Sequence, residues 1–209
     1  MTIFWDWNGT LVDDVATVVE VNNEVFARHN YPPTTVEEYR RLFRFPVIEY
    51  YRDLTVTDED FPIIAKEWNE AFVEAFHRVP LKKDVPETLR RFRQAGFRQV
   101  IISASQRDQL QVQVQQYPQL QGMFDQVLGL QDVYAVSKVQ LAKDYLARSG
   151  VNPAQALFIG DTTHDAQVAA AIGCPCRLIS GGHQIDQVLA TAGVPVLQSL
   201  LQVCDELHV

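Results

Sequence analysis

FWDWNGTLVDD, residues 4–14, places an aspartate, Asp6, between an apolar run and a turn that contains Gly9. An aspartate at the end of a buried strand is a candidate nucleophile or metal ligand, because open α/β sheets bind ligands at the carboxyl ends of their strands. Two residues further on, where a second carboxylate would make chemical sense, stands Asn8. The amide of Asn8 neither releases nor takes up a proton at neutral pH, so the loop must be explained without a second acid.

Six short apolar runs, each followed by polar residues or glycine, predict strands that are buried on both faces of a parallel sheet. Segments with helical spacing lie between them at 85–95, 138–149 and 165–172, and the last is followed by Gly173, a common helix end. This alternation predicts an α/β fold with a doubly wound parallel sheet. The six runs are TIFWDWNG, RQVIISAS, FDQVLGL, QALFIGD, CRLIS and VPVLQS.

Residues 15–83 interrupt the alternation. Helical spacing is found at 15–29, 35–43 and 58–79, and nothing in this stretch has the pattern of a buried strand. We therefore predict an α/β core domain, residues 1–14 and 84–209, and an inserted helical cap domain, residues 15–83. Insertions of this kind lie on surface loops, often over a ligand site.

Composition narrows the choice of partners. The 209 residues carry a formal net charge of −8, with 47% hydrophobic and 21% charged residues. A negative chain is a poor nonspecific binder of nucleic acid or anionic membrane. No apolar run approaches the roughly 20 residues of a membrane span, and the first residues do not resemble a signal peptide. Three cysteines in no zinc pattern suggest reduced thiols, so we expect a cytoplasmic protein.

Four signals stand at the predicted strand ends or begin the next helix. Each has an ordinary structural explanation: a strand-ending aspartate can cap a turn, a serine often forms a turn, a lone lysine is usually solvated, and GDTTHD can cap a helix. Their order and spacing are nevertheless specific when taken together. They are Asp6 in DWNGTL, Ser103 in VIISAS, Lys138 after YAVS, and Asp161 with Asp165 in FIGDTTHD.

With these motifs the chain resembles the haloacid dehalogenase superfamily, in the phosphoglycolate phosphatase-like branch that has a helical cap. The resemblance covers essentially the whole chain, including SGGHQ at 180–184 and the ending AGVPVLQSL. It implies a Rossmann-type core, a small phosphorylated substrate and a phosphatase that uses Mg²⁺.

The resemblance also implies roles for matching positions. A carboxylate nucleophile attacks phosphorus and forms an aspartyl-phosphate, and a cation bridges the two negative groups. Lysine neutralises the nucleophile and the phosphate, while a serine and adjacent main-chain N–H groups hold the phosphoryl oxygens. The implied catalytic residues are Asp6, Asn8 and Lys138; the metal ligands Asp6, Asn8 (through its carbonyl), Asp161 and Asp165; the substrate-binding residues Thr10, Ser103, Ala104, Lys138 and Arg44.

The departure from the family pattern is Asn8, because this position is usually an aspartate that protonates the leaving group and activates water. Several explanations stay open. In the first, another group, such as His164, water or the substrate, supplies the proton. In the second, the leaving group needs none, as in anhydride hydrolysis or phosphoryl transfer. In the others, the protein binds phosphate compounds without turnover, or the amide is engineered. For a hydrolase we expect aryl phosphates to be impaired less than alkyl phosphates, and Asn8→Asp to restore alkyl turnover.

Substrate specificity is assigned to the cap. Arg44 and Arg52 in RRLFRFPVIEYYRDL (40–54) are candidates for binding an anionic group, and the loop at 44–46 is expected to face the cleft. The alternative is that Arg40, Arg41 and Arg44 form one solvated helix face. Neither the substrate's identity nor the oligomeric state follows from the sequence.

Overall fold

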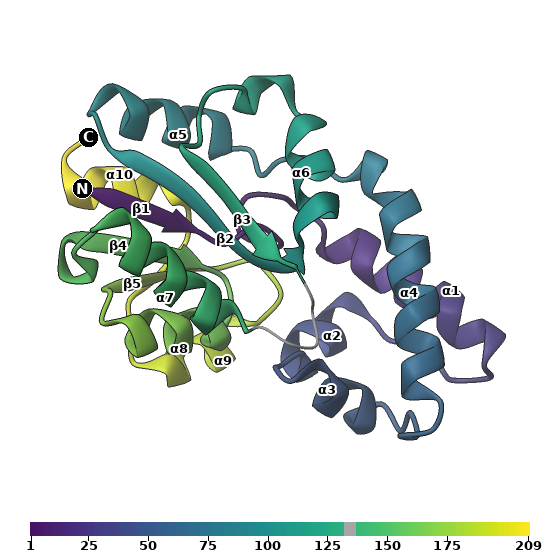
Figure 1. Cartoon of the computed structure of the whole chain (residues 1–209). Coiled ribbons are helices and arrows are strands. Elements are labelled where there is room, and N and C mark those ends of the chain that lie inside the picture. The colour runs from purple at the N-terminus through teal and green to yellow at the C-terminus, as the bar shows by residue number, and fades with distance from the viewer. Residues whose placement is uncertain (132–136) are drawn as a thin grey trace.

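The computed structural model describes residues 1–131 and 137–209 (Figure 1). Within them lies a six-stranded sheet whose strands pair in parallel in the order β3-β2-β1-β4-β5-β6, which confirms the predicted doubly wound α/β fold. Each predicted apolar run coincides with one strand, and only β2 extends beyond its run, by the single residue Gln106. The strands are β1 (Thr2–Trp5), β2 (Arg98–Gln106), β3 (Gln126–Leu130), β4 (Ala156–Gly160), β5 (Cys176–Ile179) and β6 (Val196–Leu197).

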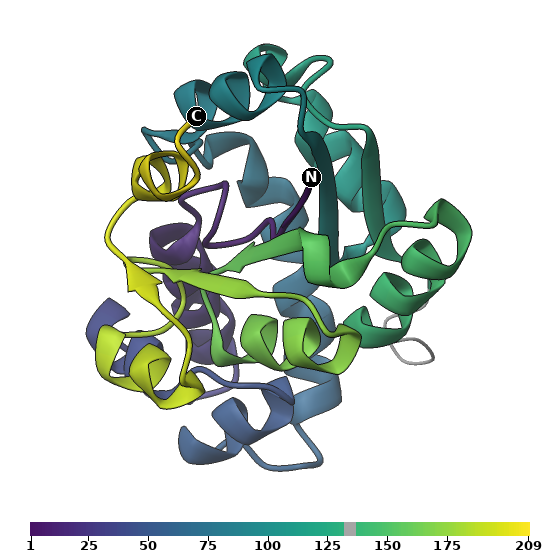
Figure 2. The same cartoon turned by 90° about the vertical axis from the view of Figure 1, so that its left-hand side faces the viewer.

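The sheet separates two apolar layers. Successive side chains of a strand point to opposite faces, so Ile3 and Trp5 of β1 enter one layer and Phe4 enters the other. The first layer is covered by α5 (Val85–Gln94), α6 (Arg107–Gln115) and α10 (Leu200–Leu207), and the second by α7 (Lys138–Ser149), α8 (Thr163–Ile172) and α9 (Asp186–Leu189). Figure 2 shows the chain from the side, with helices on both sides of the sheet. This double cover explains why the strands are apolar throughout rather than alternating.

Between residues 15 and 78 the structure assigns only helices, and they lie together beyond the ends toward which the strand arrows point (Figure 1). The helix predicted at 58–79 begins later, at Phe61. Pro62 lies in its first turn, where the N–H that proline lacks would have no helical partner. Four helices of the described residues, α3, α6, α9 and α10, were not predicted. The helices of this segment are α1 (Val15–Arg28), α2 (Val36–Leu42), α3 (Val47–Asp53), α4 (Phe61–Ala75) and the 3₁₀ turn η1 (Phe76–Arg78).

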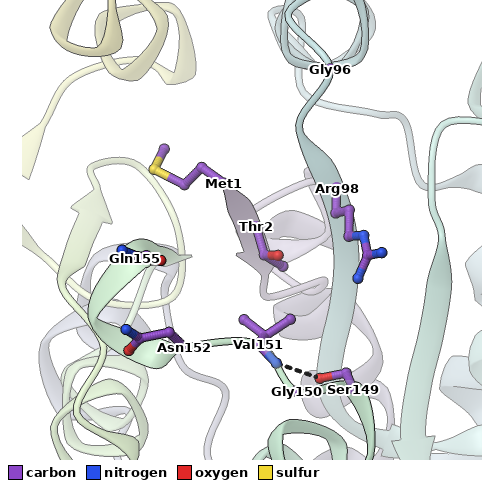
Figure 3. Close-up of a pocket in the computed structure, with 9 residues that line it drawn as sticks. All are labelled: Met1, Thr2, Gly96, Arg98, Ser149, Gly150, Val151, Asn152 and Gln155. Atoms are coloured by element: carbon purple, nitrogen blue, oxygen red, sulfur yellow. Dashed lines mark hydrogen bonds between the residues drawn. The ribbon is translucent and has the colours of Figure 1, made fainter.

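Short 3₁₀ turns η2 (Pro118–Leu120), η3 (Pro153–Gln155) and η4 (Ala190–Ala192) complete the described elements. Among the described residues, no helix is both long and apolar enough to cross a membrane. A cavity of about 670 Å³ lies where β1 and β2 begin, lined by residues that include Thr2, Arg98 and Asn152 (Figure 3). It is therefore at the opposite end of the strands from Asp6 and Asp161.

Candidate active site

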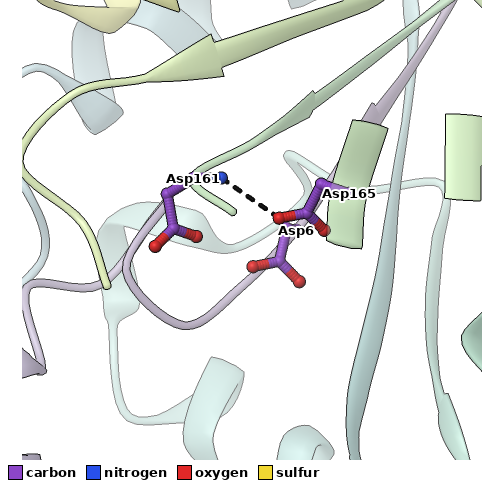
Figure 4. Close-up of side chains that lie close together, drawn as sticks. All are labelled: Asp6, Asp161 and Asp165. Carbon is purple, nitrogen blue, oxygen red and sulfur yellow. Dashed lines mark hydrogen bonds between the residues drawn. The ribbon is translucent and has the colours of Figure 1, made fainter. Parts of the chain in front are cut away.

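Asp6 and Asp161 follow two neighbouring strands, β1 and β4. Trp5 and Ile159 are paired in the sheet, and the main-chain N–H of Asp6 donates to the Ile159 carbonyl at 2.8 Å. In this strand order the connections leave β1 and β4 in opposite directions, which opens a crevice at their carboxyl ends. Asp165 joins them from the first turn of α8, and carboxylate oxygens of the three aspartates all lie within 4.8 Å of one another (Figure 4).

Lys138 is the cation of this cluster. It is the first residue of α7, its side chain is only 3% exposed, and its Nζ donates to Asp165 Oδ1 at 2.6 Å and to Asp6 Oδ1. The Ser137 hydroxyl caps the helix by accepting from the Gln140 N–H, which fixes the start of α7. The earlier part of YAVS, residues 134–136, lies outside the described residues.

The side chain of Asp165 caps helix α8 and also belongs to the acidic cluster. Its Oδ2 accepts from the Thr162 N–H at 3.0 Å and the Thr162 hydroxyl at 2.7 Å, which caps α8, while Oδ1 receives Lys138. The capping interpretation of GDTTHD was thus correct and compatible with a place in the acidic cluster. Capping holds the carboxylate beside Asp161, whose own N–H also donates to Asp165 Oδ2 at 3.2 Å.

The electrostatics of the cluster favour a bound cation. Burial, reinforced by the charges of Asp165 and Asp161, raises the pKa of Asp6 to about 8, although Lys138 acts in the opposite direction. Burial also raises the pKa of Asp161. For Lys138, burial alone would lower the pKa, but Asp165 and Asp6 hold it above its usual value. Lys138 bonds Asp6 and Asp165 but has no bond to Asp161, so the three buried carboxylates offer oxygen donors and negative charge that fit a hard divalent ion.

Thr10 contacts this cluster, whereas Ser103 and Ala104 belong to the last part of β2, the strand that pairs with β1. The Thr10 hydroxyl is fully buried and donates to Asp161 Oδ1 at 2.8 Å, so it holds that carboxylate directly. Ser103 is buried and its hydroxyl donates to Ser105 Oγ at 3.1 Å, while Ala104 is half-buried. The pairing of β2 with β3 shifts register between Ile102 and Gln106, and such a bulge turns side chains and N–H groups out of the regular ladder.

Asn8 is held from both ends of its amide. Its Nδ2 donates to Asp14 Oδ2 at 2.7 Å, and its Oδ1 accepts from the Ser105 hydroxyl at 2.9 Å. Asp14 is fully buried and its other oxygen accepts from the Gly9 N–H at 2.8 Å. Burial would raise the pKa of Asp14, but charged His183 and these donors hold it below its usual value. The Asn8 amide is thus committed to a buried carboxylate.

The predicted specificity residues of the helical segment are placed differently. Arg44 is exposed and forms an ion pair with Asp53. Arg52 forms ion pairs with Glu49 and Asp58, so acidic neighbours in the same segment already balance the charge of both arginines. The loop at 44–46 does reach the strand ends, because the ring of Phe45 stacks on His164 with centroids 4.5 Å apart. Burial and the nearby Lys138 lower the pKa of His164, which favours its neutral form.

The family model for haloacid dehalogenase-like hydrolases matches residues 3–179, which is most of the chain and includes the whole acidic cluster. The chain belongs to this family. Two curated relatives named phosphoglycolate phosphatase are 23% identical, from Synechococcus elongatus, covering 91% of this chain and 88% of that protein, and 24% identical, from Aliivibrio fischeri, covering 87% and 84%. A solved haloacid dehalogenase-like protein of Streptococcus pneumoniae superposes with a TM-score of 0.86 at 18% identity, covering 99% of this chain and 97% of that one.

This haloacid dehalogenase-like, phosphatase-like hydrolase contains site residues that sequence reasoning missed: Asp14, Ser105, Lys82 and His183. Asp14 ends the opening stretch and His183 lies in SGGHQ, but neither has a partner within local helical or strand spacing that would single it out. Lys82 is half-buried and close enough to Asp161 for their charges to interact, and burial lowers its pKa. Its main-chain N–H donates to the Leu11 carbonyl at 3.0 Å, which places the return from the helical segment beside the loop after β1.

Gly9 provides a stability test of how closely this loop packs. Its φ is +69°, and a Cβ there would lie 2.2 Å from Asp161 Oδ2 and 2.4 Å from His183 Cδ2. Gly122 has a similar φ of +72° with open space around it. We expect Gly122→Ala to cost about 1–2 kcal/mol through backbone strain alone, and Gly9→Ala to cost clearly more, measured by denaturant unfolding. If both variants lose the same free energy of unfolding, the loop at Gly9 can accommodate a Cβ, and the close packing inferred here is wrong.

Proposed function

We propose that this protein is a Mg²⁺-dependent phosphomonoester hydrolase that works through an aspartyl-phosphate on Asp6. The observation that carries the proposal is the position of Asp6: its buried carboxylate stands at the sheet crevice, bonded to Lys138 and within 4.8 Å of the other two aspartates. A nucleophilic carboxylate needs neighbouring positive charge before it can meet a phosphate dianion. Lys138 supplies part of that charge.

Mg²⁺ supplies the remainder when bound, acting as a Lewis acid on a phosphoryl oxygen. Asp6, Asp161 and the main-chain carbonyl of Asn8 would hold it, with Asp165 supporting the site, since this ion prefers a few carboxylates and keeps several waters. Thr10 and the His183 N–H each donate to Asp161, at 2.8 and 2.6 Å, and so orient it as partners of ligands commonly do.

In the first chemical step an oxygen of Asp6 attacks phosphorus and the bond from phosphorus to the ester oxygen breaks. Lys138 lies beside the attacking carboxylate and lowers the cost of bringing phosphate near it. Ser103 and the N–H groups of the irregular 103–105 segment hold the phosphoryl oxygens. The departing alkoxide takes its proton from water or from the substrate, because the Asn8 amide has none to give. Water then attacks the same phosphorus, releasing phosphate and regenerating Asp6.

The substrate proposed is a small phosphorylated metabolite. The relatives' name, phosphoglycolate phosphatase, supports a phosphomonoester of that size. We propose that helices α1–α4 act as a cap, supported by their place beyond the strand ends and by the stacking of Phe45 on His164. Arg44 stays a candidate substrate contact, which would require it to leave Asp53. A cytoplasmic location likewise stays a prediction.

A second candidate function is binding of a phosphorylated compound with slow or no turnover, or chemistry on an anhydride or acyl phosphate that needs no general acid. One observation favours this second candidate. The Asn8 amide is held by Asp14 and Ser105, so a group without acid–base function is firmly fixed where the family pattern has an acid. A screen of alkyl, aryl and acyl phosphates with Mg²⁺, scored for both binding and phosphate release, separates the three possibilities.

Metal dependence gives a direct test. We expect chelation with EDTA to abolish phosphate release and Mg²⁺ to restore it. Asp165→Asn should weaken Mg²⁺ binding by roughly 10–100-fold, because this side chain orients the ligand shell rather than dominating it. Binding is measured by calorimetry, independently of turnover. The control is Asp144→Asn, because Asp144 lies on the exposed side of α7 and its carboxylate accepts from Gln140. Unchanged Mg²⁺ affinity in Asp165→Asn would contradict the assignment.

A further inference from the structure

A path of polar contacts, made of hydrogen bonds and one ion pair, runs from the helical segment into the loop after β1. The Tyr39 hydroxyl, on α2, lies 2.7 Å from His183 Nδ1, and His183 Nε2 lies 3.3 Å from Asp14 Oδ1. Asp14 in turn receives the Asn8 amide and the Gly9 N–H. Tyr39, His183 and Asp14 are at most 6% exposed, so these contacts form away from bulk water. Polar contacts in such surroundings are costly to leave unmade.

The ring of His183 is therefore placed between a phenol and a carboxylate. The contact to Asp14 is an ion pair rather than an aligned hydrogen bond, since Nε2 meets no hydrogen-bond geometry in the described residues. Burial would lower the pKa of His183, but Asp14 and Asp161 raise it to about 9, consistent with a charged ring beside Asp14. The Phe43 ring closes one side of it, with centroids 5.3 Å apart.

The residues on both sides of His183 make a second set of contacts, with the end of α2 and the residue that follows it. The N–H of Ile185 donates to the Arg40 carbonyl at 3.2 Å, and Gln184 Nε2 donates to the Phe43 carbonyl at 2.8 Å. Arg40 also donates to the Gly181 carbonyl at 2.9 Å. Residues 181–185, here called the 181–185 turn, are thus bonded to α2 and to the residues just after it.

The 181–185 turn also binds the carboxylate of Asp161. The His183 N–H donates to Asp161 Oδ2 at 2.6 Å. A Cβ on Gly182 would lie 2.2 Å from that oxygen, so the backbone of the turn packs directly on the carboxylate. Because the turn and Asp161 are in close contact, we expect a displacement of the turn to displace the Asp161 carboxylate as well.

We propose that His183 is a positioning residue through which docking of α2 sets the orientation of Asp161 and of the Asn8 loop. Its ring links Tyr39 to Asp14 and hence to Asn8, and its main-chain N–H holds Asp161. The inference rests on the proposed function for its catalytic consequence, because those two residues belong to the Mg²⁺ site proposed above. It assigns no proton transfer to His183. The helical segment that we propose as the cap would thereby also align the groups that react with the substrate.

The test uses Tyr39→Phe, which deletes one hydroxyl and preserves the ring. The matched control is Tyr31→Phe, which removes a phenol that donates to Asp60 within the same helical segment. Hydrogen exchange of the Gly9 and Ile185 amides is followed in both variants, since the first is bonded to Asp14 and the second to Arg40. We expect Tyr39→Phe, and not Tyr31→Phe, to speed exchange at both positions. Faster exchange at Ile185 with no change at Gly9 would overturn the proposal, as would no change at either.

Kinetics and metal binding supply the second arm. Loss of one buried hydrogen bond corresponds to roughly a fivefold effect, so Tyr39→Phe should lower kcat by about that factor and weaken Mg²⁺ binding, with KM changed less. His183→Leu should have a larger effect, and adding Tyr39→Phe to it should have no further effect, because the path is already broken. His183→Asn, which keeps one polar atom near the ring's Nδ1, should recover part of the loss. Additive effects of the two substitutions would contradict the proposal.

The two proposals fail in distinguishable ways. If no form of the protein releases phosphate, the proposed function is wrong, while the exchange of the Gly9 amide still decides whether Tyr39 and the loop are coupled. If the wild-type protein is active and Tyr39→Phe changes neither exchange nor Mg²⁺ affinity, the function stands and the positioning role of His183 is wrong.

Discussion

Asp6→Asn is expected to abolish phosphomonoester hydrolysis, lowering kcat by at least about 10⁴-fold, as loss of a catalytic nucleophile does in other enzymes. The amide has nearly the same shape but is a poor nucleophile. Lys138 keeps its bond to Asp165, so the fold should persist. Phosphate release is measured with an aryl phosphate at saturating Mg²⁺, and unfolding is measured in parallel.

Asp13→Asn is the matched control for this change, because Asp13 belongs to the same loop but is exposed. It should retain wild-type activity within about twofold, as exposed substitutions away from a site usually have small effects. Residual activity of Asp6→Asn above a hundredth of wild type would show that another group attacks phosphorus, and the proposed intermediate would have to be abandoned.

The second large effect concerns Asn8 and Asp14, and here the structure changes the expectation from sequence. Asn8→Asp alone would place a carboxylate where the amide now donates to Asp14 at 2.7 Å. A half-buried carboxylate at position 8 and the buried carboxylate of Asp14 repel at that distance, so one of them must take up a proton or move. The single variant is therefore expected to be destabilised and to gain little activity.

Exchanging the two groups removes that conflict. In the double variant Asn8→Asp with Asp14→Asn, position 8 carries the acid and position 14 the amide, so the hydrogen bond between them can re-form in the opposite direction. Alkyl phosphate turnover should rise by roughly ten- to a thousandfold over wild type, below the full range of general acid–base catalysis because water already supplies part of the proton transfer. Aryl phosphates should gain less, since a phenolate leaves without as much help.

The comparison is a set of four proteins: wild type, both single variants and the double variant, each on one aryl and one alkyl phosphate at fixed Mg²⁺. Asp14→Asn alone is the control for loss of the ion pair with His183. If Asn8→Asp alone matches the double variant on both substrates, Asp14 places no constraint on position 8. If neither raises alkyl turnover, position 8 carries no proton in this enzyme.

Most of the fold was readable from local pattern. Strands covered on both faces are apolar throughout, so six runs stood out, and a helix that ends at a glycine is marked at its end, as for α8 at Gly173. Helix α6 was missed because RDQLQVQVQ buries only Leu110 and Gln113, which leaves no apolar stripe to recognise. Helix α3 was missed because it has only 7 residues, although Val47, Tyr50, Tyr51 and Leu54 have the spacing of one helix face.

The sequence by itself determined the acidic cluster and its lysine, because strand ends in a parallel sheet share one edge and residues at those ends must meet there. It determined that Asn8 departs from an acid. Only the tertiary structure decided what Asn8 contacts. Asp14 folds back through the turn at Gly9, and His183 comes from the turn after β5, two strands away from β1, with Tyr39 bonded to its ring. Such contacts join segments far apart along the chain through single polar atoms, and no periodic pattern in the sequence records them.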